Sequence, residues 1–302
     1  MVINLQRIND SSFIISLISA LGRALPLQMG HSMADFAAGQ IANRRNSKLV
    51  RAVRTNQWVV RGESLEKDAL DRAVLETLRH SARSIFDLYH YIQNPEATRQ
   101  LFVLDSTTRQ LVQRPEFDRR GLMLVGLHLS SFDLALNWLY RLGLQPLVLT
   151  IPDPQGGRRS EYERRKRTGI NLVPASIGAI RQAFRFLQLG GVVVTGIDRP
   201  VPGQKVCPRF FGRPAALPME HIFLATKAHV PVMVIVTNLQ PDGKYHLLTS
   251  ELIEMDSHPN REVEALQNAE KVLGVAKRFI QQTPQQWTIS LPVWPEILDL
   301  VP

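Results

Sequence analysis

The chain of 302 residues has little of several features that define common protein classes. Its single cysteine, Cys207, excludes an internal disulfide and any zinc site built from several cysteines. One cysteine also fits a reducing cytoplasmic setting. The best apolar stretch near the start is uncharged only over residues 11–22. A bilayer-spanning helix needs about 20 predominantly apolar residues, so this stretch is too short.

Acidic residues are outnumbered, with 27 Asp and Glu against 36 Lys and Arg, which gives a formal charge of +9. Such a balance favours anionic partners: nucleic acid, anionic lipid or an acidic carrier protein. The densest basic run covers residues 158–167. No aromatic platform or nucleic-acid-binding motif accompanies it, so the sequence disfavours nucleic acid among these partners.

Helical periodicity dominates residues 1–112, including a long segment over 64–92. Near the start, Phe13, Leu17, Leu21 and Leu25 are spaced as one apolar helix face, and basic residues follow at Arg44, Arg45, Lys48, Arg51 and Arg54. An interfacial helix with cationic neighbours can dock a protein on an anionic membrane surface. An ordinary core-facing helix fits this pattern equally well.

Residues 113–295 alternate strand and helix patterns. The expected strands cover 122–127, 147–151, 171–173, 192–197 and 232–236. The expected helices cover 133–142, 176–189, 219–228 and 261–281, and Asp242-Gly243 predicts a hairpin turn. This alternation predicts an α/β sandwich with a mostly parallel central sheet, helices on both faces and a helical N-terminal part. We expect a single domain over 1–302, with 113–302 as its α/β core.

The segment from Gly126 to Asp133 carries the strongest chemical signal. A buried strand pattern ends at His128, and Asp133 lies in the first turn of the following helix. A carboxylate beside an imidazole fixes its tautomer and stabilises its charged form, which makes the histidine a competent general base. The alternative interpretation is structural, because Ser130 and Asp133 also fit a helix-capping box.

A second polar residue, Asp198, follows the strand pattern at 192–197. Ligands of parallel sheets bind outside the carboxyl ends of their strands. Two strand ends that carry polar residues therefore predict one shared crevice, occupied by His128 and Asp198.

In order and spacing, these residues resemble a known family. The pattern His128-x4-Asp133 is followed by Asp198-Arg199 and then by Phe210-Phe211-Gly212-Arg213. This combination resembles the lysophospholipid and lipid A biosynthesis acyltransferases. The resemblance covers roughly residues 13–295, and its nearest branches are the lipid A acyltransferases and the phosphatidylinositol mannoside acyltransferases.

The resemblance implies a membrane-associated O-acyltransferase. Its donor would be acyl-ACP or acyl-CoA as co-substrate, and its acceptor a hydroxyl of a lipid A-type glycolipid or a phosphatidylinositol mannoside. His128 would act as general base oriented by Asp133, with no metal and no further cofactor. The protein would bind peripherally at the cytoplasmic face of the inner membrane. A catalytically silent lipid-binding relative is the main alternative, ahead of a nucleic-acid-binding protein.

The resemblance also implies a set of substrate-binding residues. Arg164 or Arg167 would be the binding arginine of the basic run, and Arg199 and Arg213 would hold phosphate or sugar groups. Asp198 would bond a sugar hydroxyl or pair with Arg199. The Phe210-Phe211-Gly212 hairpin would shape the pocket wall.

Overall fold

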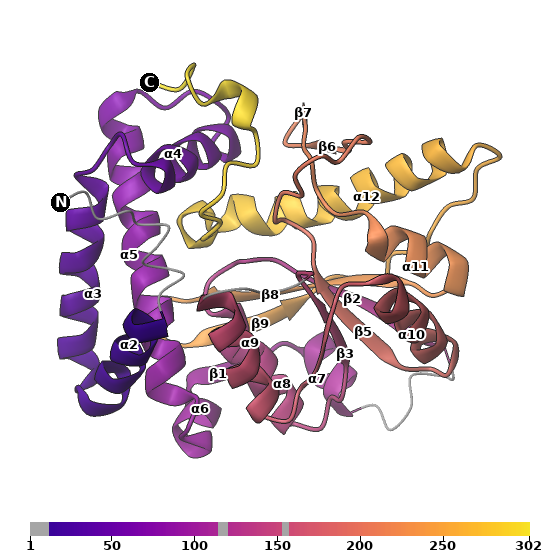
Figure 1. Cartoon of the computed structure of the whole chain (residues 1–302), viewed down its shortest axis with the longest axis horizontal. Helices are drawn as coiled ribbons and strands as arrows, with labels where there is room; N and C mark the ends of the chain where they lie inside the picture. Colours follow the sequence, from indigo (N-terminus) through magenta and orange to yellow (C-terminus); the bar gives the residue numbers. More distant parts are fainter. Residues whose placement is uncertain (1–11, 114–119, 153–156) are drawn as a thin grey trace.

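In a computed structural model the described chain comprises residues 12–113, 120–152 and 157–302. The side chains of 12–16, 157, 158, 160, 161 and 164 lie outside this description. The centre of the fold is a seven-stranded sheet with the order β1-β9-β8-β2-β5-β3-β4 (Figure 1). Its strands are β1 (Phe102–Leu104), β2 (Leu122–Gly126), β3 (Leu147–Thr150), β4 (Asn171–Pro174), β5 (Val192–Gly196), β8 (Val232–Leu239) and β9 (Tyr245–Thr249).

All strand pairs in this sheet are parallel except β8 with β9. The exception is the hairpin expected at Asp242-Gly243, where Gly243 adopts a φ of 77°. Parallel strands buried on both faces are expected to be apolar throughout. The central strand β2 meets this expectation, because residues 122–125 are all buried.

Two apolar layers enclose the sheet. The helices of this half are α7 (Ser106–Gln113), α8 (Phe132–Arg141), α9 (Gly157–Arg167), α10 (Ile177–Gln188), α11 (Glu220–Ala228) and α12 (Arg261–Gln282). Met123 and Val125 of β2 face one layer, formed mainly by α10, α11 and α12, whereas Leu122 and Leu124 face the other, formed mainly by α7 and α8. A small hairpin, β6 (Arg209–Phe210) and β7 (Arg213–Pro214), stands outside the sheet.

The N-terminal helices pack beside the sheet as a separate layer (Figure 1). They are α2 (Ser12–Ala24), α3 (Leu27–Ala42), α4 (Lys48–Val60), α5 (Lys67–Tyr91) and α6 (Pro95–Leu101). Gly22 lets α2 approach α5 closely, because a Cβ there would lie 2.6 Å from the Cβ of Tyr89. In the described ranges, no helix has both the length and the apolar character needed to cross a membrane.

The predicted α/β class and mostly parallel sheet are confirmed. One strand was missed: β1 lies within the region expected to be helical and pairs with β9 at the sheet edge. The apolar residues expected on one face of the first helix differ in their exposure. Leu17 is 47% exposed, whereas Leu21 and Leu25 are partly buried, and the side chain of Phe13 lies outside the described residues.

Candidate active site

Two neighbouring strands bring the predicted polar residues together. His128 follows β2 and Asp198 follows β5, and these strands pair in parallel with Gly126 opposite Gly196. Because both strands end at the same edge, the residues just beyond them meet. The two residues predicted at neighbouring strand ends therefore lie side by side, and the crevice expected there stays a prediction.

The imidazole of His128 is held by Asp198. Its Nδ1 lies 2.7 Å from Oδ1 of Asp198, and the backbone N–H of His128 donates to Oδ2 at 2.8 Å. The indole Nε1 of Trp287 donates to the same Oδ2 at 2.8 Å. Asp198 is fully buried, whereas 23% of the His128 side chain is exposed.

Electrostatics fix the roles within this pair. Burial alone would raise the pKa of Asp198, but the charge of His128 and the hydrogen bonds from His128 and Trp287 outweigh it and hold this pKa below its usual value. An ionised carboxylate only accepts hydrogen bonds, so Nδ1 of His128 must carry a proton. In the neutral ring the lone pair is then on Nε2, which is the arrangement a general base requires.

The expected partner of His128 was Asp133, and the structure corrects this. Asp133 forms an ion pair with Arg165, whose Nη2 lies 2.6 Å from Oδ2. The physical reason is helical geometry. Phe132 begins α8 and packs edge-on against the His128 ring with centroids 4.6 Å apart. The next residue of a helix is turned by about 100°, so Asp133 faces another direction, towards α9.

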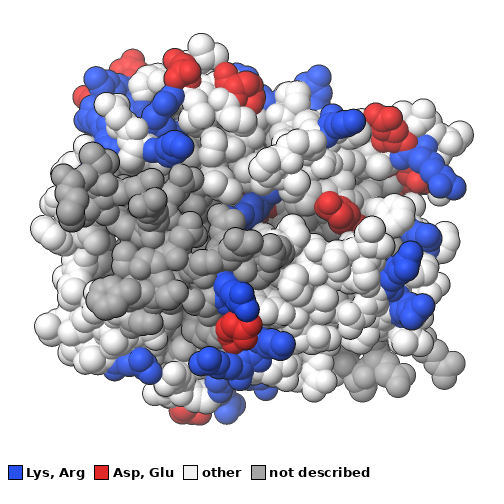
Figure 2. Space-filling model, in the orientation of Figure 1, with Lys and Arg blue, Asp and Glu red and all other residues white. Residues whose placement is uncertain are grey.

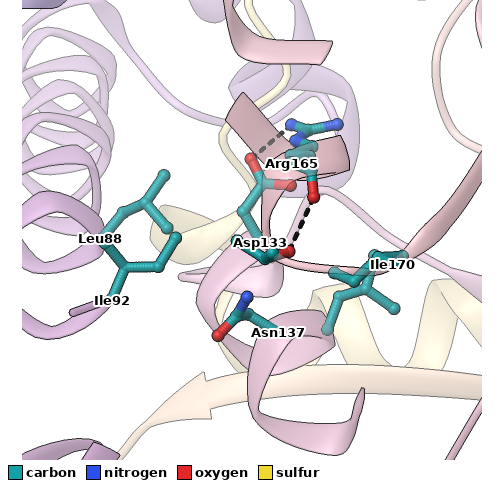
Figure 3. A pocket seen from close by; sticks show the side chains of 8 residues that line it. Leu88, Ile92, Asp133, Asn137, Arg165 and Ile170 are labelled. Carbon is teal, nitrogen blue, oxygen red and sulfur yellow. Dashed lines mark hydrogen bonds and ion pairs between the residues drawn. The ribbon is translucent and has the colours of Figure 1, made fainter. Parts of the chain in front are cut away.

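Asp133 and Arg165 lie in a small pocket between α5, α8 and α9 (Figure 3). The pocket is otherwise lined by Leu88, Ile92, Leu136, Asn137, Thr168 and Ile170. The expected binding arginines were Arg164 or Arg167. Arg167 is exposed, and the side chain of Arg164 lies outside the described residues. The arginine that contacts Asp133 of the His128-x4-Asp133 motif is therefore their neighbour Arg165, which local spacing did not single out.

The hairpin predicted at Phe210-Phe211-Gly212 is present, with φ values of 52° at Phe211 and 84° at Gly212. Phe210 is buried and stacks on Trp294 with centroids 5.9 Å apart, and Trp287 packs edge-on against it. The hairpin thus packs on the tryptophan that bonds Asp198.

The remaining predicted arginines differ in their contacts. The Nη2 of Arg213 donates to Oε2 of Glu63 at 2.8 Å, which ties the hairpin to the helical N-terminal part. Arg199 is half-buried next to Asp198 in the chain. Asp198 itself cannot serve as a sugar ligand in this state, because it is fully buried and its contacts are with His128 and Trp287.

Sequence reasoning also missed residues that hold the turn after β2. Thr288 donates to the carbonyl oxygen of His128 through both its N–H, at 2.9 Å, and its hydroxyl, at 3.0 Å. The Nε2 of His80 lies 2.9 Å from Oγ of Ser130, within hydrogen-bond distance. No motif marks Trp287, Thr288 or His80, because each reaches the turn from a distant part of the chain.

The arrangement can take a proton from a hydroxyl and stabilise the resulting imidazolium. A sequence model described as bacterial lipid A biosynthesis acyltransferase matches residues 9–295. A comparison with curated protein sequences finds no match. Because the matched region covers nearly the whole chain and contains the His128 and Asp198 strand ends, the protein belongs to the bacterial lipid A biosynthesis acyltransferase family and is an acyltransferase.

Proposed function

We propose that the protein moves a fatty acyl chain from acyl-ACP or acyl-CoA to a hydroxyl of a lipid A-type or phosphatidylinositol mannoside-type acceptor, with His128 as the general base. One observation carries this proposal. Nδ1 of His128 is bound by a buried carboxylate whose pKa is lowered, so Nε2 is the basic nitrogen. The proposal replaces Asp133 with Asp198 as the residue that orients the ring.

The steps follow from acyl-transfer chemistry. Nε2 of His128 takes the proton of the acceptor hydroxyl while that oxygen attacks the thioester carbonyl carbon. Asp198 stabilises the imidazolium that forms. The tetrahedral oxyanion then collapses, the carbon–sulfur bond breaks, and the thiolate leaves with the proton from the imidazolium. The products are an ester and a free thiol, and no acyl-enzyme is required.

The oxyanion needs donors near the start of α8. The first N–H groups of a helix have no intrahelical partners and lie at the positive end of its dipole. Ser131 is the N-cap of α8, and its side chain makes no capping bond. These amides lie three to five residues from His128 and are the donors that we assign to the oxyanion. Arg165 already serves Asp133, so we do not assign it this role.

We assign binding of the acceptor headgroup to residues near the sheet edge that carries His128 and Asp198. Arg199 adjoins Asp198 and is half-buried, which suits a fixed fork for a phosphate group. Arg167 is exposed on α9 and can reach a larger headgroup. Phe211, on the hairpin, is only partly buried and offers an apolar wall.

An acyl-transfer assay in detergent micelles tests the proposal. Wild type and His128→Ala are incubated with labelled acyl-CoA or acyl-ACP and a panel of glycolipid acceptors. We expect the wild type to form acylated lipid and the variant to be slower by about a thousandfold or more, a loss typical of an essential base. Equal rates would remove His128 from the chemistry. Absence of product with several intact donors would favour the silent lipid-binding relative.

For the donor, the charge distribution favours an acidic carrier protein. Lys and Arg side chains gather over α10 and α11 (Figure 2), and the acidic residue of these two helices is Glu220, at the start of α11. The exposed face of α10 carries Arg181 and Arg185, and α10 has no acidic residue. Ile177 and Leu189, at its two ends, are 77% and 85% exposed. Cations flanked by exposed apolar side chains suit the acidic surface of a folded partner.

A comparison of donors tests this choice. We expect Arg181→Glu/Arg185→Glu to raise KM for acyl-ACP about tenfold or more and to change KM for acyl-CoA much less. The double variant Arg99→Glu/Arg109→Glu alters net charge equally at exposed positions on α6 and α7 and is the matched control. Equal effects of the two double variants on KM would show that the change depends on overall charge and not on a docking site on α10.

Membrane association is supported by an apolar stripe on α3. Met29, Met33 and Phe36 lie one helical turn apart and are 54%, 48% and 70% exposed. We propose that this stripe docks the protein peripherally on the cytoplasmic face of the inner membrane. Met33→Asp/Phe36→Asp should weaken sedimentation with phosphatidylglycerol-containing vesicles at least tenfold, because burial of one such side chain stabilises by about 1.5–3 kcal/mol. Leu189→Asp, at the opposite end of the molecule, is the control and should bind as wild type does.

A further inference from the structure

The turn between β2 and α8 contains a residue in an unfavourable backbone conformation. Ser130 has a φ of 53° and is 3% exposed. The left-handed region is uncommon for residues with a Cβ, and Asn, Asp and Gly are its usual occupants. Such a conformation persists only where the surroundings determine it, and it occurs preferentially at functional sites.

Two separate parts of the fold hold Ser130 in place. Its N–H donates to the carbonyl oxygen of Gln286 at 2.8 Å, and its Oγ lies 2.9 Å from Nε2 of His80 on α5. Gln286 is itself fixed, because its side chain exchanges two hydrogen bonds of 2.8 Å with the backbone of Leu239 at the end of β8. The turn is thus held on one side by the sheet and on the other by a single side chain from the helical N-terminal part.

The position of this turn decides where the reacting groups lie. Two residues before Ser130 is His128, whose ring must meet Asp198. The residue after it is Ser131, the N-cap of α8, whose hydroxyl is buried without a hydrogen-bond partner among the described residues. A rotation at Ser130 would therefore move the base and the first amides of α8 relative to each other.

We propose that His80 is a positioning residue for acyl transfer, because its hydrogen bond to Ser130 fixes the left-handed turn that sets His128 against the N-terminus of α8. The inference rests on the proposed function of His128. Among the described residues, His80 has no hydrogen bond with the His128 ring or with Asp198, and it acts through Ser130.

The environment of His80 suits a neutral tether. Burial lowers its pKa to about 4, with Asp87 raising and Arg83 lowering it to smaller extents. The ring is therefore neutral near pH 7 and has one donor and one acceptor nitrogen. A neutral tether fixes the turn without adding charge beside His128 and Asp198. A glutamine amide also offers one neutral donor group and one acceptor, so His80→Gln is the conservative replacement.

Kinetics of four variants test the positioning role. We expect His80→Ala and Ser130→Ala to lower kcat tenfold or more with KM changed less than twofold. His80→Gln should recover kcat to within about threefold of wild type. Because the two residues share one bond, His80→Ala/Ser130→Ala should be no slower than the slower single variant. His90→Ala is the matched control, since His90 also lies on α5 but bonds the carbonyl oxygen of Gly22.

A proton NMR measurement separates this inference from the proposed function. The Nδ1–H of His128, bound to a carboxylate, should give a far-downfield resonance that disappears in Asp198→Asn. His80→Ala should shift or broaden it, and His90→Ala should leave it unchanged. This readout needs no substrate, so it decides the positioning role even if wild type transfers no acyl group.

Folding failure would not leave the question open. If His80→Ala does not fold, Ser130→Gly replaces it, because glycine adopts the left-handed conformation freely while removing the hydroxyl. Its kcat should fall as in Ser130→Ala. Unchanged kcat together with an unchanged Nδ1–H resonance, in a folded variant that lacks the bond, would overturn the inference.

Discussion

Replacement of Asp198 by asparagine is the most informative perturbation of this site. The carboxylate is fully buried and accepts hydrogen bonds from the N–H and Nδ1 of His128 and from Nε1 of Trp287. Asparagine keeps the shape but offers one acceptor oxygen and an NH2 group that can only donate. At least one of the three donors must then face another donor.

The kinetic effect follows from the tautomer. If the asparagine NH2 faces Nδ1, that nitrogen becomes the acceptor and the proton moves to Nε2, which can no longer act as a base. In addition, no negative charge stabilises the imidazolium. The corresponding substitution in the serine protease triad, a general worked example, costs about 10⁴ in kcat. We expect a loss of about 10³–10⁴, which corresponds to roughly 4–5.5 kcal/mol of transition-state stabilisation.

Stability changes far less than activity. One unsatisfied buried donor costs about 1–3 kcal/mol, so Asp198→Asn should remain folded with a lowered Tm. The assay is kcat at saturating donor, measured beside thermal unfolding of the same preparation.

The matched control is Asp133→Asn, because Asp133 is the carboxylate that sequence spacing favours as the partner of His128. Its partner is Arg165 and its side chain is 20% exposed, so we expect a kcat loss of less than about tenfold. If Asp133→Asn were the slower variant, or if Asp198→Asn kept kcat within tenfold of wild type, the assignment of Asp198 to His128 would be refuted.

Three further predictions concern other parts of the same framework. Trp287→Phe should lower kcat about tenfold by removing the indole bond to Asp198. Trp294→Phe removes a buried indole whose N–H has no hydrogen-bond partner among the described residues, and it should lower only the Tm. Glu63→Gln and Arg213→Gln should each change stability by about 1 kcal/mol or less, since the pair is about one-third exposed; a raised KM in Arg213→Gln alone would instead reveal substrate binding. Stability should fall as pH drops from about 6.5 towards 3, because burial lowers the pKa of His221 to about 3 and the unfolded chain then binds a proton that the folded chain does not. The slope is at most about 1.4 kcal/mol per pH unit for this group, and urea unfolding of His221→Leu should show a flatter dependence than wild type or than the exposed-site control His258→Leu.

Much of the α/β core could be predicted because its signals are local. The run at Leu122 to Val125 is apolar at every position, as a strand buried on both faces must be. Asp242-Gly243 predicted a hairpin because glycine supplies the positive φ of the turn. The strand β1 was missed for the opposite reason: residues 102–104 are too few to show a period, and their pairing with β9 is a long-range event.

The partner of His128 illustrates where local reasoning stops. Spacing along the chain placed Asp133 five residues from His128, and this separation suited a contact across a turn. A helix, however, points successive side chains about 100° apart, and in α8 the position facing the ring is taken by Phe132. The carboxylate that meets His128 lies 70 residues away in sequence and arrives through the pairing of β5 with β2. Parallel pairing, rather than proximity in sequence, brings an acid to a base at the edge of such a sheet. The sequence contained both strand ends, so the meeting of His128 and Asp198 could be predicted. Which of the two aspartates contacts the His128 ring depends on the strand order β8-β2-β5 and on the left-handed turn at Ser130, and neither has a local signal.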